Sequence, residues 1–170
     1  MRLTSHATTL RRLSPGDLAA FQAYRNDPIV ARFQSWEQMD DAKATHFLTH
    51  ASAITPLLRP GHWTQIAVAD SETDALLGDM GLHLATDQAS AELGITLART
   101  AQGQGHATRA VSLAVALLLD TTRIAKINAW AEVNNAPSRR LMERTGFVQT
   151  GIETTDGVTE AVFVFERPVA

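Results

Sequence analysis

The sequence predicts an α/β fold in which a mostly antiparallel sheet of about seven strands packs against four helices. Three observations lead to this prediction. Segments with alternating apolar residues, typical of strands, are separated by segments whose apolar residues recur every three or four positions, typical of helices. Short turns join most neighbouring strands, which favours antiparallel pairing. Only the middle part, where the helix at residues 105–119 links two strands, requires a parallel crossover.

Each segment is placed by its own pattern and by the turn residues that flank it. Alternation is clearest at residues 91–98, where Leu93, Ile95 and Leu97 share one face. In chain order the predicted elements are a strand at 9–13, helices at 15–25 and 39–54, strands at 63–69, 75–84 and 91–98, a helix at 105–119, a strand at 127–133, a helix at 136–145, and strands at 147–154 and 158–166.

Capping and turn residues indicate where elements begin and end. Ser14 is suited to cap the first helix because its hydroxyl can accept a backbone N–H, and Pro15 suits the first helical position. Asn135 is expected to cap the last helix in the same way, and Gly146 lies just past the end of that helix. Asp156-Gly157 predicts the turn of the final hairpin.

Composition bounds the class of protein. A chain of 170 residues with 45% hydrophobic and 19% charged residues fits one globular domain over residues 1–170, and we expect it in the cytoplasm. The net charge of -3 gives no reason to expect a nucleic-acid partner. The most apolar run, at residues 110–119, is too short to span a bilayer, so no membrane partner is expected.

The chain contains no cysteine. This excludes disulfides, thiolate metal sites and any mechanism through an acyl-cysteine intermediate. His46 and His50 lie four apart on one face of a predicted helix, as metal ligands can. No acidic residue completes such a motif, so a solvated helix face is the better interpretation. We therefore expect no metal.

The most informative segment is a strand that runs into a loop with two glycines, Gly103 and Gly105, directly before the central helix. Glycines let the backbone approach a ligand closely, and the first amides of a helix are unpaired and carry partial positive charge. The spacing therefore suits a pyrophosphate bound by main chain, although a Gly-x-Gly pair is also common in plain turns. The sequence lacks the Lys-Ser/Thr pair of a nucleotide P-loop and the three-glycine dinucleotide fingerprint.

The loop residues Gln102-Gly103-Gln104-Gly105-His106-Ala107 resemble the Gln/Arg-x-x-Gly-x-Gly/Ala signature of the GNAT (Gcn5-related) N-acetyltransferase superfamily. Downstream, Asn135-Ala136-Pro137-Ser138 and then Gly146-Phe147 are similar to an element of its RimJ/RimL ribosomal-protein acetyltransferase branch. Upstream, Arg25-Asn26-Asp27-Pro28 and Gly78-Asp79 stand where that branch has similar residues. The elements occur in the right order along nearly the whole chain.

The resemblance implies a GNAT-type fold, with helices on both faces of the sheet, and acetyl-CoA as co-substrate. In that family the strand before the loop diverges from its neighbour and pairs with the pantetheine arm, which implies that Ile95, Thr96 and Leu97 lie along the arm. Asn135 and Ser138 are implied near the thioester. The loop residues implied in pyrophosphate binding are Gln102, Gly103, Gln104, Gly105, His106, Ala107 and Thr108.

In this chemistry the amine attacks the thioester carbonyl directly, so the enzyme must position the amine, accept its proton and protonate the leaving thiolate. Ser138 is a candidate proton donor, or only a residue of the first helical turn. Glu92 is a candidate base acting through water, or a strand residue with a structural partner. Asn135 is also a candidate site residue, and its expected role is to shape the site as the N-cap of the helix rather than to take part in the chemistry. Asp79 and His83 are further candidate bases.

Two positions depart from the pattern of the branch. A Tyr that serves as general acid commonly stands four residues before the Gly-Phe pair, where this chain has Met142. Met donates no proton, so Ser138 or a water is left as the acid. Arg109 replaces the Glu that commonly follows the Ala-Thr pair, which alters either the acceptor pocket or a contact on the helix surface. Arg139 and Arg140 either reach the cofactor phosphates or face solvent.

The expected function is transfer of an acetyl group from acetyl-CoA to a primary amine, such as a protein N-terminus. A small amine, for example a polyamine or an aminoglycoside, is the first alternative, and a non-catalytic acyl-CoA sensor is the second. The aromatic residues Tyr24, Phe33, Trp36 and Trp63 either line the acceptor side or belong to the core. A homodimer is usual in the branch and is expected here.

Overall fold

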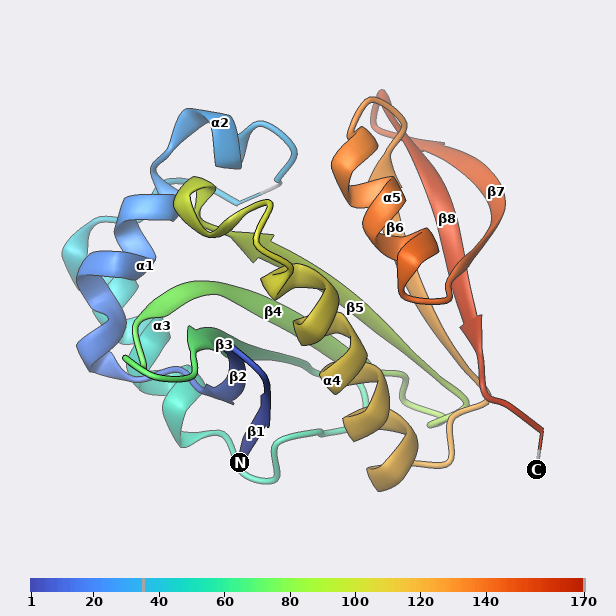
Figure 1. Ribbon diagram of the computed structural model, residues 1–170, viewed down its shortest axis with the longest axis horizontal. Coiled ribbons are helices and arrows are strands. Elements are labelled where there is room, and N and C mark those ends of the chain that lie inside the picture. The colour runs from blue at the N-terminus through green and yellow to red at the C-terminus, as the bar shows by residue number, and fades with distance from the viewer. Residues whose placement is uncertain (35, 170) are drawn as a thin grey trace.

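The structure is a computed structural model that describes residues 1–34 and 36–169. Within these residues an eight-stranded sheet has the order β1-β2-β3-β4-β5-β6-β8-β7 (Figure 1). All neighbouring strands pair antiparallel except β5 and β6, which are parallel. The strands are β1 (Arg2–Ser5), β2 (Thr8–Arg12), β3 (Trp63–Asp70), β4 (Leu76–Leu84), β5 (Ser90–Leu97), β6 (Lys126–Glu132), β7 (Val148–Thr155) and β8 (Val158–Glu166).

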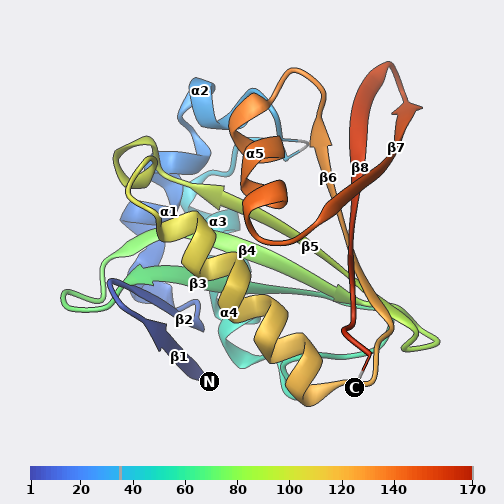
Figure 2. The same cartoon turned by 45° about the vertical axis from the view of Figure 1, so that its right-hand side comes forward.

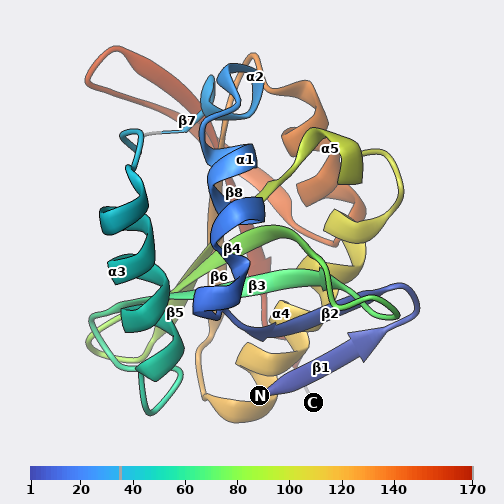
Figure 3. The same ribbon diagram turned by 90° about the vertical axis from the view of Figure 1, so that its left-hand side faces the viewer.

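Helices cover both faces of this sheet, which confirms the predicted fold class. The helices α4 and α5 lie on one face, and α1 and α3 lie on the other (Figures 2 and 3). None of the helices in the described part of the chain is long and apolar enough to cross a membrane. The helices are α1 (Leu18–Arg25), α2 (Pro28–Ala31), α3 (Asp41–Ala53), α4 (His106–Thr121) and α5 (Ala136–Arg144), with short 3-10 turns η1 (Pro15–Asp17) and η2 (Arg99–Ala101).

Two elements go beyond the sequence prediction. The edge strand β1 makes the sheet eight-stranded rather than about seven-stranded; its four residues are too few for alternation to stand out. The one-turn helix α2 begins where the first helix was expected only to stop. The carboxylate of Asp27 accepts a hydrogen bond from the backbone N–H of Ile29 at 2.9 Å, and Pro28 follows as the first helical residue. The same residues thus end one helix and start another.

The predicted capping residues act as expected. Ser14 and Asp17 form a capping box at η1. The Ser14 hydroxyl accepts a hydrogen bond from the backbone N–H of Gly16, and the Asp17 carboxylate accepts one from the backbone N–H of Ser14, which fixes the entry of the chain into α1. Gly146 has φ +88° just past α5. Asp156 and Gly157 are both left-handed, with φ 51° and 81°, as the two-residue turn between β7 and β8 requires.

Apolar residues fill two layers, one on each side of the sheet. On one side α4 presents the predicted stripe, with Ala110, Val111, Ala114 and Leu118 all buried against the strands. On the other side a smaller core joins α1 and α3 to β3, with Phe21 at its centre. The sheet between these layers is the platform on which the site is built.

The ladder between β5 and β6 is short, and the two strands diverge beyond it. Pairing stops at Glu92 and Asn128, and the ribbons of β5 and β6 separate beyond these residues (Figure 1); we call this interruption of the strand pairing the notch. β5 instead follows β4, because Gly78 lets the two backbones approach closely: a Cβ at Gly78 would collide with the carbonyl oxygen of Thr96. The edge of β5 that faces the notch therefore has backbone N–H and C=O groups without a ladder partner.

Candidate active site

The loop before α4 has the conformation that the two glycines were expected to provide. Gly103 and Gly105 have φ +74° and +81°, in the left-handed region that favours glycine. Gly105 is the N-cap of α4 but has no side chain to accept a hydrogen bond, and the first helical bond runs from the N–H of Arg109 to the carbonyl of Gly105 at 3.2 Å. The N–H groups of residues 106–108 consequently have no acceptor within the helix, and an anion placed there would supply one.

Side chains of the loop hold it in place and leave its backbone free for a ligand. The Gln102 amide donates to the carbonyl of Leu97 at 3.0 Å. His106 is buried, and its Nδ1 lies 2.9 Å from the Thr8 hydroxyl on β2. The Gln104 amide donates to a carbonyl within the preceding turn. Any ligand contact at these positions would thus come mainly from the main chain.

The three arginines near the predicted cofactor site differ in their contacts and exposure. Arg109 folds back over the loop, and its guanidinium donates to the carbonyl of Gln104 at 3.1 Å. Of its two predicted roles, the structure therefore supports the contact on the helix surface rather than one in an acceptor pocket. Arg139 donates to the carbonyl of Val133, beside β6, and Arg140 is exposed.

The first turn of α5 lies across the notch from β5 (Figure 1). Asn135 is its N-cap: the side-chain oxygen accepts the N–H of Ser138 at 3.2 Å, so this residue shapes the turn. The hydroxyl of Ser138 is half-buried and forms no hydrogen bond with another described residue. Met142 is buried in the core one turn further along and can donate no proton.

On the face opposite α4 and α5, pairing register places three polar or aromatic side chains in one row. Trp63 is opposite His83, and His83 is opposite Glu92. The rings of Trp63 and His83 are 5.3 Å apart, and His83 Nδ1 lies 3.8 Å from a carboxylate oxygen of Glu92. Nδ1 is buried and has no hydrogen-bond partner among the described residues. The His83 imidazole and the Glu92 carboxylate therefore lie side by side without a hydrogen bond between them.

The next row along these strands consists of Gln65, Gly81 and Gly94, and the sheet is uncovered at Gly94. Gly81 is opposite Gly94, and a Cβ at Gly94 would have no heavy atom within 4 Å. A Cβ at Gly81 would meet the side-chain oxygen of Gln65 at 3.1 Å and the Trp63 ring at 3.2 Å. The two glycines form what we call the glycine floor, which is exposed at Gly94, covered by Gln65 and Trp63 at Gly81, and bounded by Glu92 at one end.

A buried ion pair lies in the next row of the sheet, at the other end of the glycine floor. Asp79, opposite Thr96, bonds to the guanidinium of Arg25 and accepts from the Gln65 amide at 3.1 Å. Burial raises the pKa of Asp79, whereas Arg25 and then Gln65 act to lower it. Because Asp79 is 1% exposed and held by both partners, it is not free to act as the base that the sequence also allowed.

Three aromatic rings enclose the guanidinium of Arg25. Its central carbon lies 4.0 Å from the ring centre of Trp36, 4.7 Å from that of Phe21 and 5.7 Å from that of Phe47. Tyr24 is also buried here, and burial raises the pKa of its hydroxyl far above the usual range. Tyr24 thus belongs to the packing beneath the site, Trp36 is partly buried on top of that packing, and Trp63 is 55% exposed.

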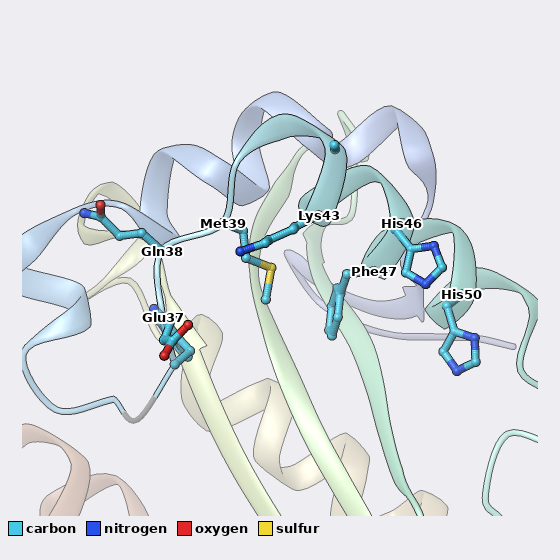
Figure 4. A pocket seen from close by; sticks show the side chains of 9 residues that line it. Glu37, Gln38, Met39, Lys43, His46, Phe47 and His50 are labelled. Carbon is cyan, nitrogen blue, oxygen red and sulfur yellow. The ribbon is translucent and has the colours of Figure 1, made fainter.

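A hollow of about 840 Å³ opens above this packing, between α3 and the segment before it. In Figure 4, Glu37 lies on one side, Phe47, His46 and His50 lie along α3 on the other, and Met39 is between them. Sequence reasoning missed both this hollow and the glycine floor. The signal for the floor was present as glycines in two adjacent strands, but their pairing depends on register, which the sequence alone did not give.

The comparisons with known proteins agree with this geometry. The family model described as an acetyltransferase (GNAT) domain matches residues 8–148. An uncharacterized N-acetyltransferase, p20, of Bacillus licheniformis is 24% identical over 151 residues, which are 88% of this chain and 84% of that protein. A GNAT-family acetyltransferase from Bacillus anthracis has a TM-score of 0.85 at 16% identity, covering 98% of each chain. The aminoglycoside acetyltransferase AAC(6')-Ib in complex with coenzyme A has a TM-score of 0.75 at 21% identity, covering 95% of each chain.

The chain belongs to the GNAT acetyltransferase family, because the family model spans most of its length. It is accordingly an acetyltransferase that uses acetyl-CoA. The match is to the GNAT domain as a whole and does not single out the ribosomal-protein branch.

Proposed function

We propose that this protein transfers the acetyl group of acetyl-CoA to a primary amine that enters over the floor formed by Gly81 and Gly94. One observation supports the cofactor placement above others. Two left-handed glycines, Gly103 and Gly105, deliver the chain to a helix whose first amides have no acceptor, directly after a strand with an unpaired edge. A diphosphate joined to a peptide-like arm is complementary to both features at once.

In this arrangement the main chain of residues 103–108 binds the pyrophosphate, and the guanidinium of Arg109 adds positive charge beside it. The backbone of Ile95, Thr96 and Leu97 pairs with the pantetheine arm along the notch. Gln102 and His106 hold the loop through their side chains. The arm then ends at the notch between β5 and β6, with its thioester close to Gly94 on one side and Ser138 on the other.

The chemistry needs one base and one acid. The nitrogen of the amine attacks the thioester carbonyl, and its proton passes to Glu92 directly or through water. His83 lies beside the Glu92 carboxylate. As the tetrahedral intermediate collapses, the carbon–sulfur bond breaks and the thiolate leaves with a proton from Ser138 or from water. The products are an N-acetyl amide and CoA. Asn135 contributes by fixing the helix turn that carries Ser138.

Two classes of acceptor are compatible with this cleft. A protein N-terminus is our first candidate, because the floor is open at the surface and an extended chain can leave it. A cationic small amine is the second, and one observation favours it: Glu132, Glu160 and Glu153 are cross-strand neighbours on β6, β8 and β7. A catalytic role fits the cleft better than that of a non-catalytic acyl-CoA sensor, because Glu92 and His83 face an open floor.

The experiment is an assay of free CoA thiol after mixing the protein, acetyl-CoA and a panel of peptides and small amines. We expect thiol release that depends on one class of amine and an acetylated product of matching mass. The variant Gly105→Val should release no thiol with the same acceptor. Release without any amine dependence, or none from the wild type with every class of amine, would contradict the proposal.

A further inference from the structure

We infer that the hollow between α3 and residues 36–39 binds an aromatic or bulky apolar group attached close to the acceptor amine. This inference rests on the proposed function and names the class of acceptor for that same site. The preferred substrate would be an amine such as the N-terminus of a peptide that begins with Phe, and not a polycation.

The walls of the hollow are mainly apolar. Trp36, Met39, Ala42 and Phe47 supply the apolar surface, and the polar or titratable lining residues are Glu37, Gln38, Lys43, His46 and His50 (Figure 4). Its volume of about 840 Å³ is within the range of small-molecule sites. Apolar surface left uncovered beside an active site gains free energy when an apolar group of the substrate covers it.

The aromatic walls are held in place before any ligand arrives. Trp36 lies over the Arg25 guanidinium, and its indole N–H donates to the Arg25 carbonyl at 3.3 Å. Phe47 stacks on Phe21 with ring centres 5.4 Å apart. Since neither ring must be ordered on binding, little conformational entropy is lost when a ligand ring packs against them. The buried pair of Arg25 with Asp79 supports this rigidity from beneath.

The hollow lies within reach of the place where the amine reacts. Trp36 contacts Arg25, which bonds to Asp79, and Asp79 is two residues before Gly81 on the same face of β4. The glycine floor and the hollow are therefore connected by this series of contacts on one face of the sheet, and an amine above the floor can direct its own ring towards the hollow.

The charges that line the hollow disfavour a polycation in the same position. Glu37 and Lys43 carry opposite charges, and the other polar lining residues, Gln38, His46 and His50, add no negative charge, so the hollow has no net attraction for an ammonium group. Desolvating a second ammonium group against Trp36 and Phe47 would also cost free energy without a buried counter-ion, because the nearest one, Asp79, is already paired with Arg25. The acidic residues Glu132, Glu153 and Glu160 belong to other strands, β6, β7 and β8.

The test compares Ala42→Trp with Thr49→Trp. Both positions are exposed on α3, but Ala42 lines the hollow and Thr49 does not, so only the first variant fills it. With saturating acetyl-CoA, kcat/KM is measured for Phe-Gly-Gly, Gly-Gly-Gly and spermidine. We expect the wild type to prefer Phe-Gly-Gly by about tenfold or more, as for a side chain that enters an apolar pocket. Ala42→Trp should lose that preference through a higher KM, and Thr49→Trp should keep it.

The outcomes separate this inference from the proposed function. If the wild type acetylates Gly-Gly-Gly or spermidine at least as well as Phe-Gly-Gly, the transferase proposal stands and the apolar subsite is wrong. The subsite is also wrong if Ala42→Trp retains the preference while its KM for acetyl-CoA shows an intact cofactor site. If the wild type acetylates no amine although acetyl-CoA raises its melting temperature, the proposed function fails and the subsite inference falls with it.

Discussion

Asp79 and Glu92 are acidic residues on adjacent strands, and both face the side of the sheet opposite α4. Asp79 is buried and bonded to Arg25, whose guanidinium Trp36 covers, so its carboxylate is taken up by this packing. The side chain of Glu92 is 37% exposed and lies beside His83 at the edge of the glycine floor. Burial and pairing, rather than residue type, thus separate the structural carboxylate from the candidate base.

The first prediction at this scale concerns Glu92. Replacing Glu92 with Gln removes the proton acceptor while keeping the shape of the side chain, so we expect kcat to fall by about 10²–10⁴. The KM for acetyl-CoA should stay near that of the wild type. Steady-state kinetics of both proteins test this, and an unchanged kcat would remove Glu92 from the mechanism.

A second prediction concerns Ser138. The variant Ser138→Ala keeps the N-cap bond, because Asn135 accepts the backbone N–H of residue 138 and not its hydroxyl. We expect turnover to fall by about 10², the lower end for loss of a proton donor, since a thiolate leaves readily. The KM for acetyl-CoA should stay near that of the wild type. Full activity in the variant would leave water as the donor.

The residues of the cofactor loop and of the α5 turn could be found from sequence because each is defined by its neighbours in the chain. Gly103 and Gly105 show the predicted left-handed backbone, and Asn135 shows the predicted cap. Gln65 and Trp63 could not be found in this way. Their roles depend on facing Gly81 across a strand pair, and a shift of one residue in register would turn them to the other face.

At the scale of elements, the ion pair of Arg25 with Asp79 joins α1 to β4 within the apolar layer. We predict that Asp79→Asn lowers the free energy of unfolding by about 3 kcal/mol, because it leaves a buried guanidinium without its counter-ion. Asp27→Asn is the matched control. Asp27 pairs with the exposed Arg99 at 2.6 Å, and Asn can still cap α2, so the cost should be clearly smaller than that of Asp79→Asn. Equal costs in urea denaturation would contradict this assignment.

The hairpin of β7 and β8 gives a prediction about pH. Burial, and then the neighbouring Glu132 and Glu153, raise the pKa of Glu160 in the folded protein. A raised carboxyl pKa contributes stability that is fully present below the unfolded pKa and is lost as pH rises through the folded pKa. Glu160→Gln should therefore raise the melting temperature at pH 7, by about 1 °C, and not at pH 4.

Glu166 on the same strand provides the control for that change. Glu166 stands opposite Lys126, so Glu166→Gln removes an attraction and should not raise the melting temperature at pH 7. A gain of similar size from both variants would show that general charge reduction, and not the three neighbouring glutamates, accounts for the effect.

The order and type of most elements followed from the sequence because their signals are local. The helix stripe of α4, the caps of η1 and α5 and the Asp156-Gly157 turn are each set by residues within a few positions. The edge strand β1 lacked such a signal, since it depends on pairing with β2. The notch between β5 and β6 is likewise a result of contact between strands, at Gly78, and no local pattern encodes it.

At the scale of the whole molecule, the notch divides the sheet into two parts, β1–β5 and β6–β8, joined by only the short parallel ladder between β5 and β6 (Figure 1). A ligand that pairs with the free edge of β5 and caps α4 would fill this gap and stabilise both parts together. Binding and fold stability should consequently be linked, because a ligand that binds only the native state stabilises it by mass action.

The last prediction measures that linkage. At a concentration 100 times its Kd, acetyl-CoA should add about 2.7 kcal/mol to the stability, which corresponds to a rise in melting temperature of roughly 5–10 °C. Gly105→Val should abolish this rise, since a branched side chain would lie against the loop amides and collide with the Arg109 guanidinium, 3.1 Å from a Cβ at that position. Gly157→Val is the matched control, because Gly157 has the same φ of +81° in a distant hairpin turn. Both variants should lose stability from backbone strain. Only Gly157→Val should keep the rise with acetyl-CoA; a rise in both would mean that the loop is a turn and that the cofactor binds elsewhere.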